Sequence, residues 1–443
     1  MNTRTVGNYS FELGPLHIVS ERMQELRQQH DTLGSETVII LQEIWKTETE
    51  NSGQSTHRMD LYGILASHHT EDETLSKFWG QIHSVPEWVD WDQIKRGQKF
   101  FYRYALANLI GFALQGFMGE NAASSGTAEV LIRTGGFSTR KLLGRLLETF
   151  QFLLQVTESE EAIKPGGVGH VTTVRVRLLH AMVHGRISNL EKVKPGYFDV
   201  EKFGKPINDF DCIHAISTFC CNHSWLQLPQ MGVHPTYQET ADYIALFRYV
   251  AYVIGTPDEY FADVARSKAT MESMLLSLQI NSTSRIMGHN FVQCLKDLPP
   301  VNISAEFIEA GCRVLNGDEF CDKLGLGKPG LYSYACFKGF CWFVRALAFL
   351  QCISPGLDRS LTNFFQRALH QGIIQSKSGL AGGTKFDFKY TPRIGQKVGK
   401  EDNNRLPPLF PRPVESFLFL VFAVGCLSPI AGLGLLFYLV KVW

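Results

Sequence analysis

Apolar residues recur every three or four positions through most of this sequence, and few stretches alternate with a period of two. The first pattern places apolar side chains on one face of an α-helix, whereas alternation indicates a half-buried strand. The segment 100–118 is almost wholly apolar and is predicted to be a buried core helix. We therefore predict an all-α fold, with further helices at 139–156, 213–226, 239–254, 257–278 and 332–352.

One predicted helix, 171–186, carries more charge than its apolar pattern explains. It follows the glycine-rich loop 165–169 and reads VTTVRVRLLHAMVHGR, with two arginines and two histidines. Buried charge is costly unless it is paired. Either the helix turns a polar side to solvent, or it binds a cofactor with an apolar body, a metal that takes a neutral imidazole, and carboxylates that pair with arginine. Haem has all three properties.

Two histidines of this helix, His180 and His184, also have the spacing of metal ligands. Residues four apart on a helix can chelate one ion. The third ligand of such a site stays open among Asp211, His214 and His223.

Charge and cysteine usage narrow the class of protein. The chain of 443 residues has 43 basic and 43 acidic side chains, so no strong field favours nucleic acid as a partner. The ten cysteines form no CxxC pair, which indicates a reduced compartment rather than a disulfide framework. No CxxCH run is present, so a haem would be held without covalent attachment. GLGKPG at 325–330 matches a dinucleotide-binding fingerprint by letter but follows no predicted strand.

The far end of the sequence has the composition of a membrane segment. Residues 416–440 contain no charged side chain and would extend about 36 Å as a helix, enough for a hydrocarbon core of about 30 Å. We read it as a tail anchor that leaves the domain on the cytosolic side. The polar residues 1–35 do not resemble a signal peptide. The predicted segments are an N-terminal helical extension (1–59), a catalytic domain (60–375), a linker rich in Gly, Lys and Pro (376–414), and a transmembrane helix (415–441).

Several short motifs occur in a definite order between residues 86 and 257. Together they resemble the family that joins rubber oxygenase (latex-clearing protein) with the endoplasmic-reticulum oxygenase of the mycophenolic acid pathway. The RVRLLHA run is the most specific of them. The motifs are Trp88-Val89-Asp90-Trp91 with Arg96-Gly97, Thr134-Gly135, Arg145 with Thr149, Arg175-Val176-Arg177-Leu178-Leu179-His180-Ala181, and 243–255 with Phe247-Arg248-Tyr249.

This resemblance implies a globin-like helical core that binds haem b. It implies that His180 is the proximal iron ligand and that Arg145 and Thr149 belong to the haem pocket. A glutamate one short helix upstream is the base in rubber cleavage, and Glu129 has that spacing from Arg145. One departure is that Glu148 stands where the rubber enzyme has a lysine that can cap the iron.

The residue chemistry agrees with these implications. Arg175 and Arg177 are candidates to pair with the haem propionates, and His184 is a further candidate cofactor-binding residue. We therefore predict a haem b-dependent, single-pass oxygenase of the endoplasmic-reticulum membrane, with dioxygen as co-substrate. It would cleave a C=C bond of an apolar terpenoid or polyene in a secondary-metabolite pathway. The expected partners are this small substrate and membrane lipid, and the need for an electron donor stays open. The alternatives are hydroxylation or desaturation on the same haem, and a non-catalytic helical membrane protein.

Overall fold

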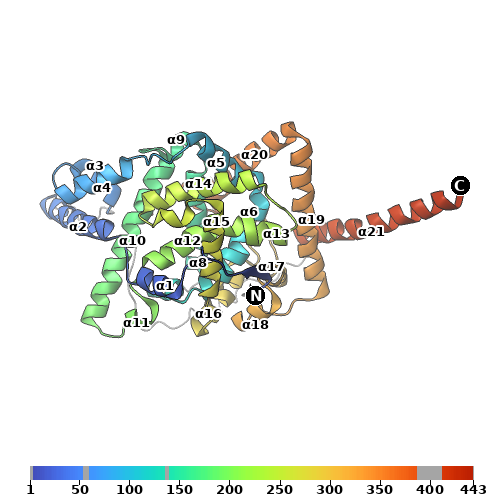
Figure 1. The fold of residues 1–443 in the computed structure, drawn as a ribbon, viewed down its shortest axis with the longest axis horizontal. Coiled ribbons are helices and arrows are strands. Elements are labelled where there is room, and N and C mark those ends of the chain that lie inside the picture. The colour runs from blue at the N-terminus through green and yellow to red at the C-terminus, as the bar shows by residue number, and fades with distance from the viewer. Residues whose placement is uncertain (1–2, 53–58, 135–138, 387–411, 443) are drawn as a thin grey trace.

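The computed structural model describes residues 3–52, 59–134, 139–386 and 412–442, and only the backbone of residues 52, 140 and 428–442. Within these ranges the chain is helical except for one two-stranded antiparallel sheet. This confirms the all-α prediction. Figure 1 shows a helical body from which one long helix projects.

The first sixty residues differ from the predicted helical extension in two ways. They begin with a hairpin whose turn contains Gly7 at φ +56°, followed by Asn8, a pair that favours such turns. Leu26 and Leu41 are then fully buried in the main core, so this segment packs into the domain instead of extending from it. The elements are β1 (Thr3–Val6), β2 (Tyr9–Glu12), α1 (Ser20–Arg27), α2 (Thr32–Ser52), α3 (Leu61–His68) and α4 (Glu73–His83).

The apolar stretch 100–118 is buried as predicted, but it is not one helix. A first helix ends at Arg103, and the chain then passes through a short α-helix into a π-helical segment. The helix predicted at 139–156 has those bounds, while Gly135, Gly136 and its predicted N-cap Ser138 lie outside the described residues. The elements are α5 (Trp91–Arg103), α6 (Ala105–Gly111), η1 (Phe112–Asn121), α7 (Ser125–Arg133), α8 (Thr139–Val156) and α9 (Glu160–Ile163).

The RVRLLHA motif lies in the middle of the longest helix of the body, α10. This helix packs against α2, α8 and α14, so it joins the N-terminal helices to the core (Figure 1). The elements of this part are α10 (Val168–Val193), α11 (Val200–Phe203), α12 (Asp209–Asn222), η2 (His223–Gln227), α13 (Leu228–Gln230), α14 (Tyr237–Ile254), η3 (Asp258–Phe261), α15 (Val264–Leu276) and α16 (Ser282–Leu295).

Two of the sequence motifs form a brace between α5 and α14. A Cβ on Gly97 would lie 2.2 Å from the carbonyl oxygen of Asp242, so only glycine permits this close approach. Arg96 beside it donates to both carboxylate oxygens of Asp242, at 2.8 and 3.1 Å. Arg248 of α14 lies over the ring of Trp88, 3.9 Å from its centroid. These motif residues therefore fix the helix that packs behind α10.

The last helices are the projecting helix and those that build the side of the body next to it (Figure 1). They are α17 (Ala305–Asn316), α18 (Asp318–Leu324), α19 (Leu331–Ile353), α20 (Pro355–Leu369), η4 (His370–Gln375) and α21 (Pro413–Val442). The first part of the predicted linker docks on the body, since the Thr384 backbone exchanges hydrogen bonds with the Gln151 side chain. Residues 387–411 lie outside the described residues. Among the described side chains α19 is the helix long and apolar enough to cross a membrane, and 39% of its most apolar window is buried.

Candidate functional site

A small cavity lies beside the middle of α10, where the N-terminal segment and α12 meet that helix. His180 faces it together with Arg177 and His184 of the same helix. The opposite wall comes from the loop between α1 and α2 and from the start of α12. Those wall residues include His30, Asp31, Asp209 and Cys212.

His180 has the properties that a metal-binding imidazole needs. Desolvation lowers its pKa to about 4, which the nearby Asp31 carboxylate only partly offsets, so the ring is neutral at physiological pH. It makes no hydrogen bond to any residue in the described ranges, so a ring nitrogen keeps its lone pair free. A single neutral imidazole is sufficient to hold haem iron. The residue that the RVRLLHA motif singles out therefore fits that group.

Arg177 is part of the wall of this cavity, held by a buried ion pair. Its Nε donates to Asp31 at 2.7 Å and one terminal nitrogen donates to the other carboxylate oxygen at 2.9 Å. Gly255, at the end of α14, has φ +79°, and a Cβ there would lie 2.5 Å from the Arg177 Nε. The glycine thus serves both the left-handed turn and the space that the guanidinium needs. The role of Arg177 toward a propionate stays a prediction.

His184 and Arg175 have different surroundings from His180. The His184 Nδ1 lies 2.6 Å from the carbonyl oxygen of Pro206, and its ring stacks on His30 with centroids 4.0 Å apart. Arg175 donates to both carboxylate oxygens of Asp60, at 3.0 and 3.2 Å, away from the cavity. Both side chains therefore already have protein partners, and their cofactor roles stay predictions.

Glu129 lies on α7, and Arg145 and Thr149 lie one turn apart on α8. A carboxylate oxygen of Glu129 lies 3.2 Å from a guanidinium nitrogen of Arg133, one turn further along α7. Arg145 of α8 donates to the carbonyl oxygen and the hydroxyl of Thr134, at 2.9 and 2.7 Å. The Thr149 hydroxyl donates to the Arg145 carbonyl oxygen at 2.8 Å. Arg145 therefore links α8 to the end of α7, whereas Glu129 is paired within α7 and Thr149 within α8. We refer to these three residues as the α7–α8 polar group, and their catalytic roles stay predictions.

This polar group and His180 lie on helices that pack together. Val130, the neighbour of Glu129, is buried in a small apolar cluster with Val183, three residues after His180. Helix α8 also packs directly on α10. On α12, Cys212, Ala215 and Phe219 form a half-exposed stripe on an otherwise buried helix. Helices α7 and α8 therefore contact α10, and α12 contributes to the wall of the His180 cavity.

The three candidates for a third metal ligand do not join His180 and His184. His214 is bound 2.9 Å from the buried carboxylate of Glu120, and Asp211 packs against Gly126 of α7. His223 lies among aromatic rings, 5.8 Å from the Tyr243 ring centroid. No cluster of three His, Cys, Asp or Glu side chains in the described residues has metal-binding geometry. The described structure therefore does not support a metal ion chelated by His180 and His184 with a third ligand. Haem requires no such cluster, because one imidazole can hold its iron.

His223 carries a prediction about pH. It is fully buried, and neither ring nitrogen has a well-formed hydrogen bond within the described ranges. Desolvation lowers its pKa to about 3, below its unfolded value near 6.5. Below pH 6.5 the unfolded chain thus takes up a proton that the folded protein does not. The free energy of unfolding therefore decreases as the pH is lowered. His223 alone should make the free energy of unfolding about 2 kcal/mol smaller at pH 5 than at pH 8.

We therefore expect His223→Phe to raise the free energy of unfolding more at pH 5 than at pH 8, by about that amount. Urea denaturation of wild type and variant at both pH values measures the difference. His234→Gln, which removes an exposed histidine, is the matched control and should leave the pH dependence unchanged. An equal effect of His223→Phe at both pH values would contradict the prediction.

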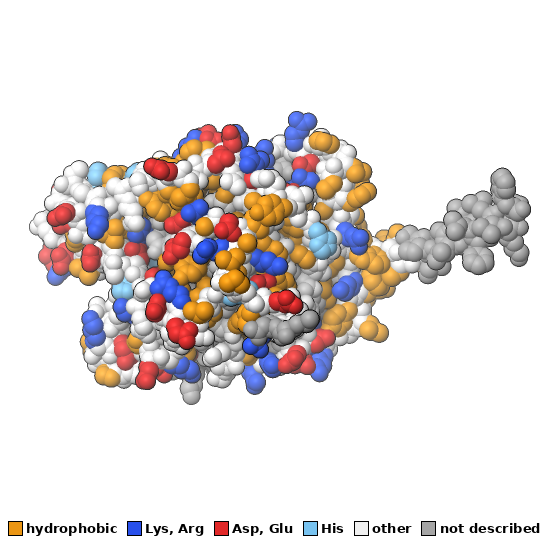
Figure 2. Space-filling view, viewed as in Figure 1, with side chains coloured by type: hydrophobic (Ala, Val, Ile, Leu, Met, Phe, Trp, Pro, Cys, Tyr) orange, Lys and Arg blue, Asp and Glu red, His pale blue; other side chains and the backbone are white. Residues whose placement is uncertain are grey.

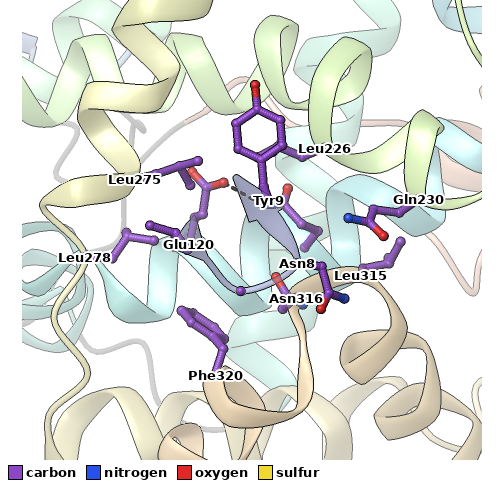
Figure 3. A pocket seen from close by; sticks show the side chains of 13 residues that line it. Asn8, Tyr9, Glu120, Leu226, Gln230, Leu275, Leu278, Leu315, Asn316 and Phe320 are labelled. Carbon is purple, nitrogen blue, oxygen red and sulfur yellow. Dashed lines mark hydrogen bonds between the residues drawn. The ribbon is translucent and has the colours of Figure 1, made fainter. Parts of the chain in front are cut away.

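A second cavity lies beneath the N-terminal hairpin, and Figure 3 shows the labelled side chains around it. The hairpin is pinned there, because the Asn8 amide donates to the Val314 carbonyl oxygen at 3.0 Å and the Tyr9 hydroxyl to Glu272 at 2.7 Å. Glu120 at its inner wall accepts hydrogen bonds from Gln115 and Asn222, in addition to the contact with His214. These three partners explain how the Glu120 carboxylate can be buried in the core.

The residues 100–346 match the family model "ER-bound oxygenase mpaB/B'/Rubber oxygenase, catalytic domain". This is more than half of the chain, and the chain belongs to that all-α oxygenase family. The solved structure of latex clearing protein LCP in the closed state has the same fold, with a TM-score of 0.58 and 17% sequence identity. The alignment covers 80% of this chain and 95% of that one. Comparison with curated proteins gives no match.

Asp31 and His30 are among the residues of the His180 cavity that the sequence did not predict. They lie about 150 positions before His180, in a polar segment that was read as an extension. No spacing rule links such distant positions. The only available signal was that Arg177, on an apolar helix face, required a carboxylate partner from elsewhere in the chain.

Proposed function

We propose that this protein is a membrane-anchored, haem b-dependent oxygenase that oxidises an apolar, unsaturated substrate with dioxygen. Family membership supports the oxygenase class. The observation that carries the haem assignment is His180, a neutral imidazole without a hydrogen-bond partner in the described structure, at the RVRLLHA position and facing a cavity. When bound, haem would supply the iron at which dioxygen is activated.

In this proposal His180 supplies the one protein ligand, and the surrounding residues hold it in place. The buried pair of Arg177 and Asp31 fixes the wall against which α10 rests. The Asp31 carboxylate lines the same cavity and partly offsets the effect of desolvation on the pKa of the ring. Arg175, through Asp60, and His184, through Pro206, would fix α10 on either side of His180 along the helix.

The polar group at the α7–α8 junction would provide the acid–base chemistry. Glu129 would accept an allylic proton from the substrate, with Arg133 orienting the carboxylate. Arg145 would hold α8 against the end of α7 through Thr134, and Thr149, one turn further along α8, would line the pocket with it. The family description, which names a rubber oxygenase, supports a terpenoid or polyene as the substrate.

The endoplasmic-reticulum membrane and a role in secondary metabolism are part of the same proposal. Their support is the apolar composition of α21 and the family description. Oxidative C=C cleavage is the proposed reaction, and hydroxylation on the same haem is its alternative. Whether a separate reductant takes part depends on which of the two occurs, because hydroxylation requires two further electrons and cleavage does not.

Incubation of the purified protein with squalene under ¹⁸O₂ separates the two reactions. Cleavage breaks one C=C bond and gives two carbonyl fragments with one ¹⁸O each, whereas hydroxylation leaves the carbon skeleton intact with one ¹⁸O. We expect paired carbonyl fragments, trapped by borodeuteride reduction and identified by mass spectrometry. Saturated squalane is the matched control and should give none. An alcohol with an intact carbon skeleton and one ¹⁸O would show that the reaction is hydroxylation rather than cleavage. If neither squalene nor squalane were oxidised, the proposed substrate class would be contradicted.

A further inference from the structure

The exposed apolar side chains of this protein gather on one side of the body. Eleven of the twenty exposed large apolar side chains in the described residues lie on α19, α20 and the first half of α21. They include Leu331 at 89% exposure and Phe349 at 64% on α19, Phe364 on α20, and Leu420 and Leu427 on α21. Figure 2 shows orange side chains at the edge of the body from which α21 projects. Such a concentration indicates a surface that water does not cover in the functional state.

Helices α19 and α21 are joined tightly where they cross. A Cβ on Gly339 would lie 1.9 Å from the carbonyl oxygen of Leu418, and one on Gly425 would meet the Trp342 ring at 2.0 Å. Trp342 also stacks on Phe422, with ring centroids 5.2 Å apart. Small residues that let helix backbones approach are typical of membrane helix pairs. The orientation of α21 therefore sets the orientation of α19.

The arrangement fits a helix that lies along a membrane rather than across it. Figure 1 shows α19 running across the base of α21, which points away from the body. One side of α19 is packed on the domain, with Cys336, Phe337 and Val344 buried. Lys338 and Arg345 are exposed on the same helix, which has no acidic residue. An apolar helix with basic residues, partly embedded beside its protein, is typical of the headgroup region.

We propose that α19 and α20 form a membrane-docking face that lies in the headgroup region of an anionic bilayer. The occupant is a lipid surface because the face is continuous with α21, whose apolar sequence enters the same bilayer. Lys338 and Arg345 of α19, which share a helix face with Leu331 and Phe349, give this face exposed cations that complement anionic lipid. This inference rests on the proposed membrane anchorage and adds that the body itself is held against the bilayer in one orientation.

Nitroxide depth measurements on the full-length protein in phosphatidylcholine–phosphatidylserine vesicles test this face. The exposed thiols are first removed by Cys352→Ser and Cys426→Ser. Single labels are then introduced by Phe349→Cys on the docking face, Leu427→Cys on α21 and Val193→Cys at the far end of α10, all exposed positions. Oxygen relaxes labels in lipid more strongly, and a water-soluble nickel chelate relaxes labels in water.

We expect labels at positions 349 and 427 to favour oxygen and the label at 193 to favour nickel. Oxygen preference at 427 with nickel preference at 349 would overturn the docking face but leave the anchor in place. Nickel preference at all three positions would overturn both the anchor and the face. A label at 349 shielded from both reagents would show that protein, not lipid, covers this surface, and would also overturn the inference.

Discussion

His180→Ala is expected to fold but to purify with most of its haem lost, and with it the oxygenase activity. The reason is that His180 offers a neutral imidazole without a hydrogen bond beside the cavity, whereas His184 is hydrogen-bonded to Pro206 and His30 stacks on His184. The change removes a half-buried ring that makes no hydrogen bond there, so the fold should persist. Haem content per chain and far-ultraviolet circular dichroism measure the two effects.

His184→Ala is the matched control, because it lies one turn away on the same helix. Its ring is occupied by the Pro206 carbonyl oxygen and the His30 stack, so its loss should lower stability while haem is retained. External imidazole should restore part of the haem binding of the His180 variant, since it can enter the space left by the side chain. Full haem in His180→Ala together with loss in His184→Ala would reverse the ligand assignment.

Glu129→Gln is expected to retain haem and dioxygen binding but to lose at least about two orders of magnitude in turnover. The amide keeps the shape of the side chain and its hydrogen bonding near Thr283, 3.5 Å away, but cannot accept the allylic proton. The Arg133 contact becomes weaker without a charge, so a small stability change accompanies the loss. Single-turnover product formation, with the visible spectrum of each variant, separates chemistry from cofactor binding.

Two other glutamates of this region serve as comparisons. Glu158→Gln, on an exposed side chain just after α8, should leave turnover unchanged. Glu148→Gln tests the position where the rubber enzyme has its lysine. A loss in Glu148→Gln with wild-type turnover in Glu129→Gln would transfer the role of base to Glu148. Wild-type turnover in both variants would exclude a carboxylate base at the α7–α8 junction.

The long helices were predictable because local signals in the sequence agree with their packing. Helix α8 has the predicted bounds 139–156, and α14 begins with a capping box at Thr236 and ends at Gly255 in the left-handed conformation. The hairpin 3–12 was missed because its two strands have only four residues each. The break after Arg103 was missed because an apolar stretch has the same pattern whether it forms one helix or two.

The sequence predicted candidate site residues within local motifs, but it did not predict the partners that the fold brings to them from distant positions. The motif singled out His180 and the spacing singled out Glu129, Arg145 and Thr149, and the roles of all four residues stay predictions. The partners of the arginines depended on tertiary contacts: Asp31 comes from before α2 and Asp60 from the N-cap of α3. Sequence alone therefore assigned both arginines to haem propionates, without the carboxylates that the fold places beside them.

The central claim is that this chain binds one haem b through His180, and an absorption spectrum tests it most directly. The full-length protein is purified from cells supplied with a haem precursor, and its pyridine haemochrome is measured against protein concentration. We predict a Soret band and the reduced haemochrome spectrum of haem b, at one haem per chain, with both signals lost in His180→Ala. A folded wild-type protein that shows no Soret band, even after titration with haemin, would contradict the account.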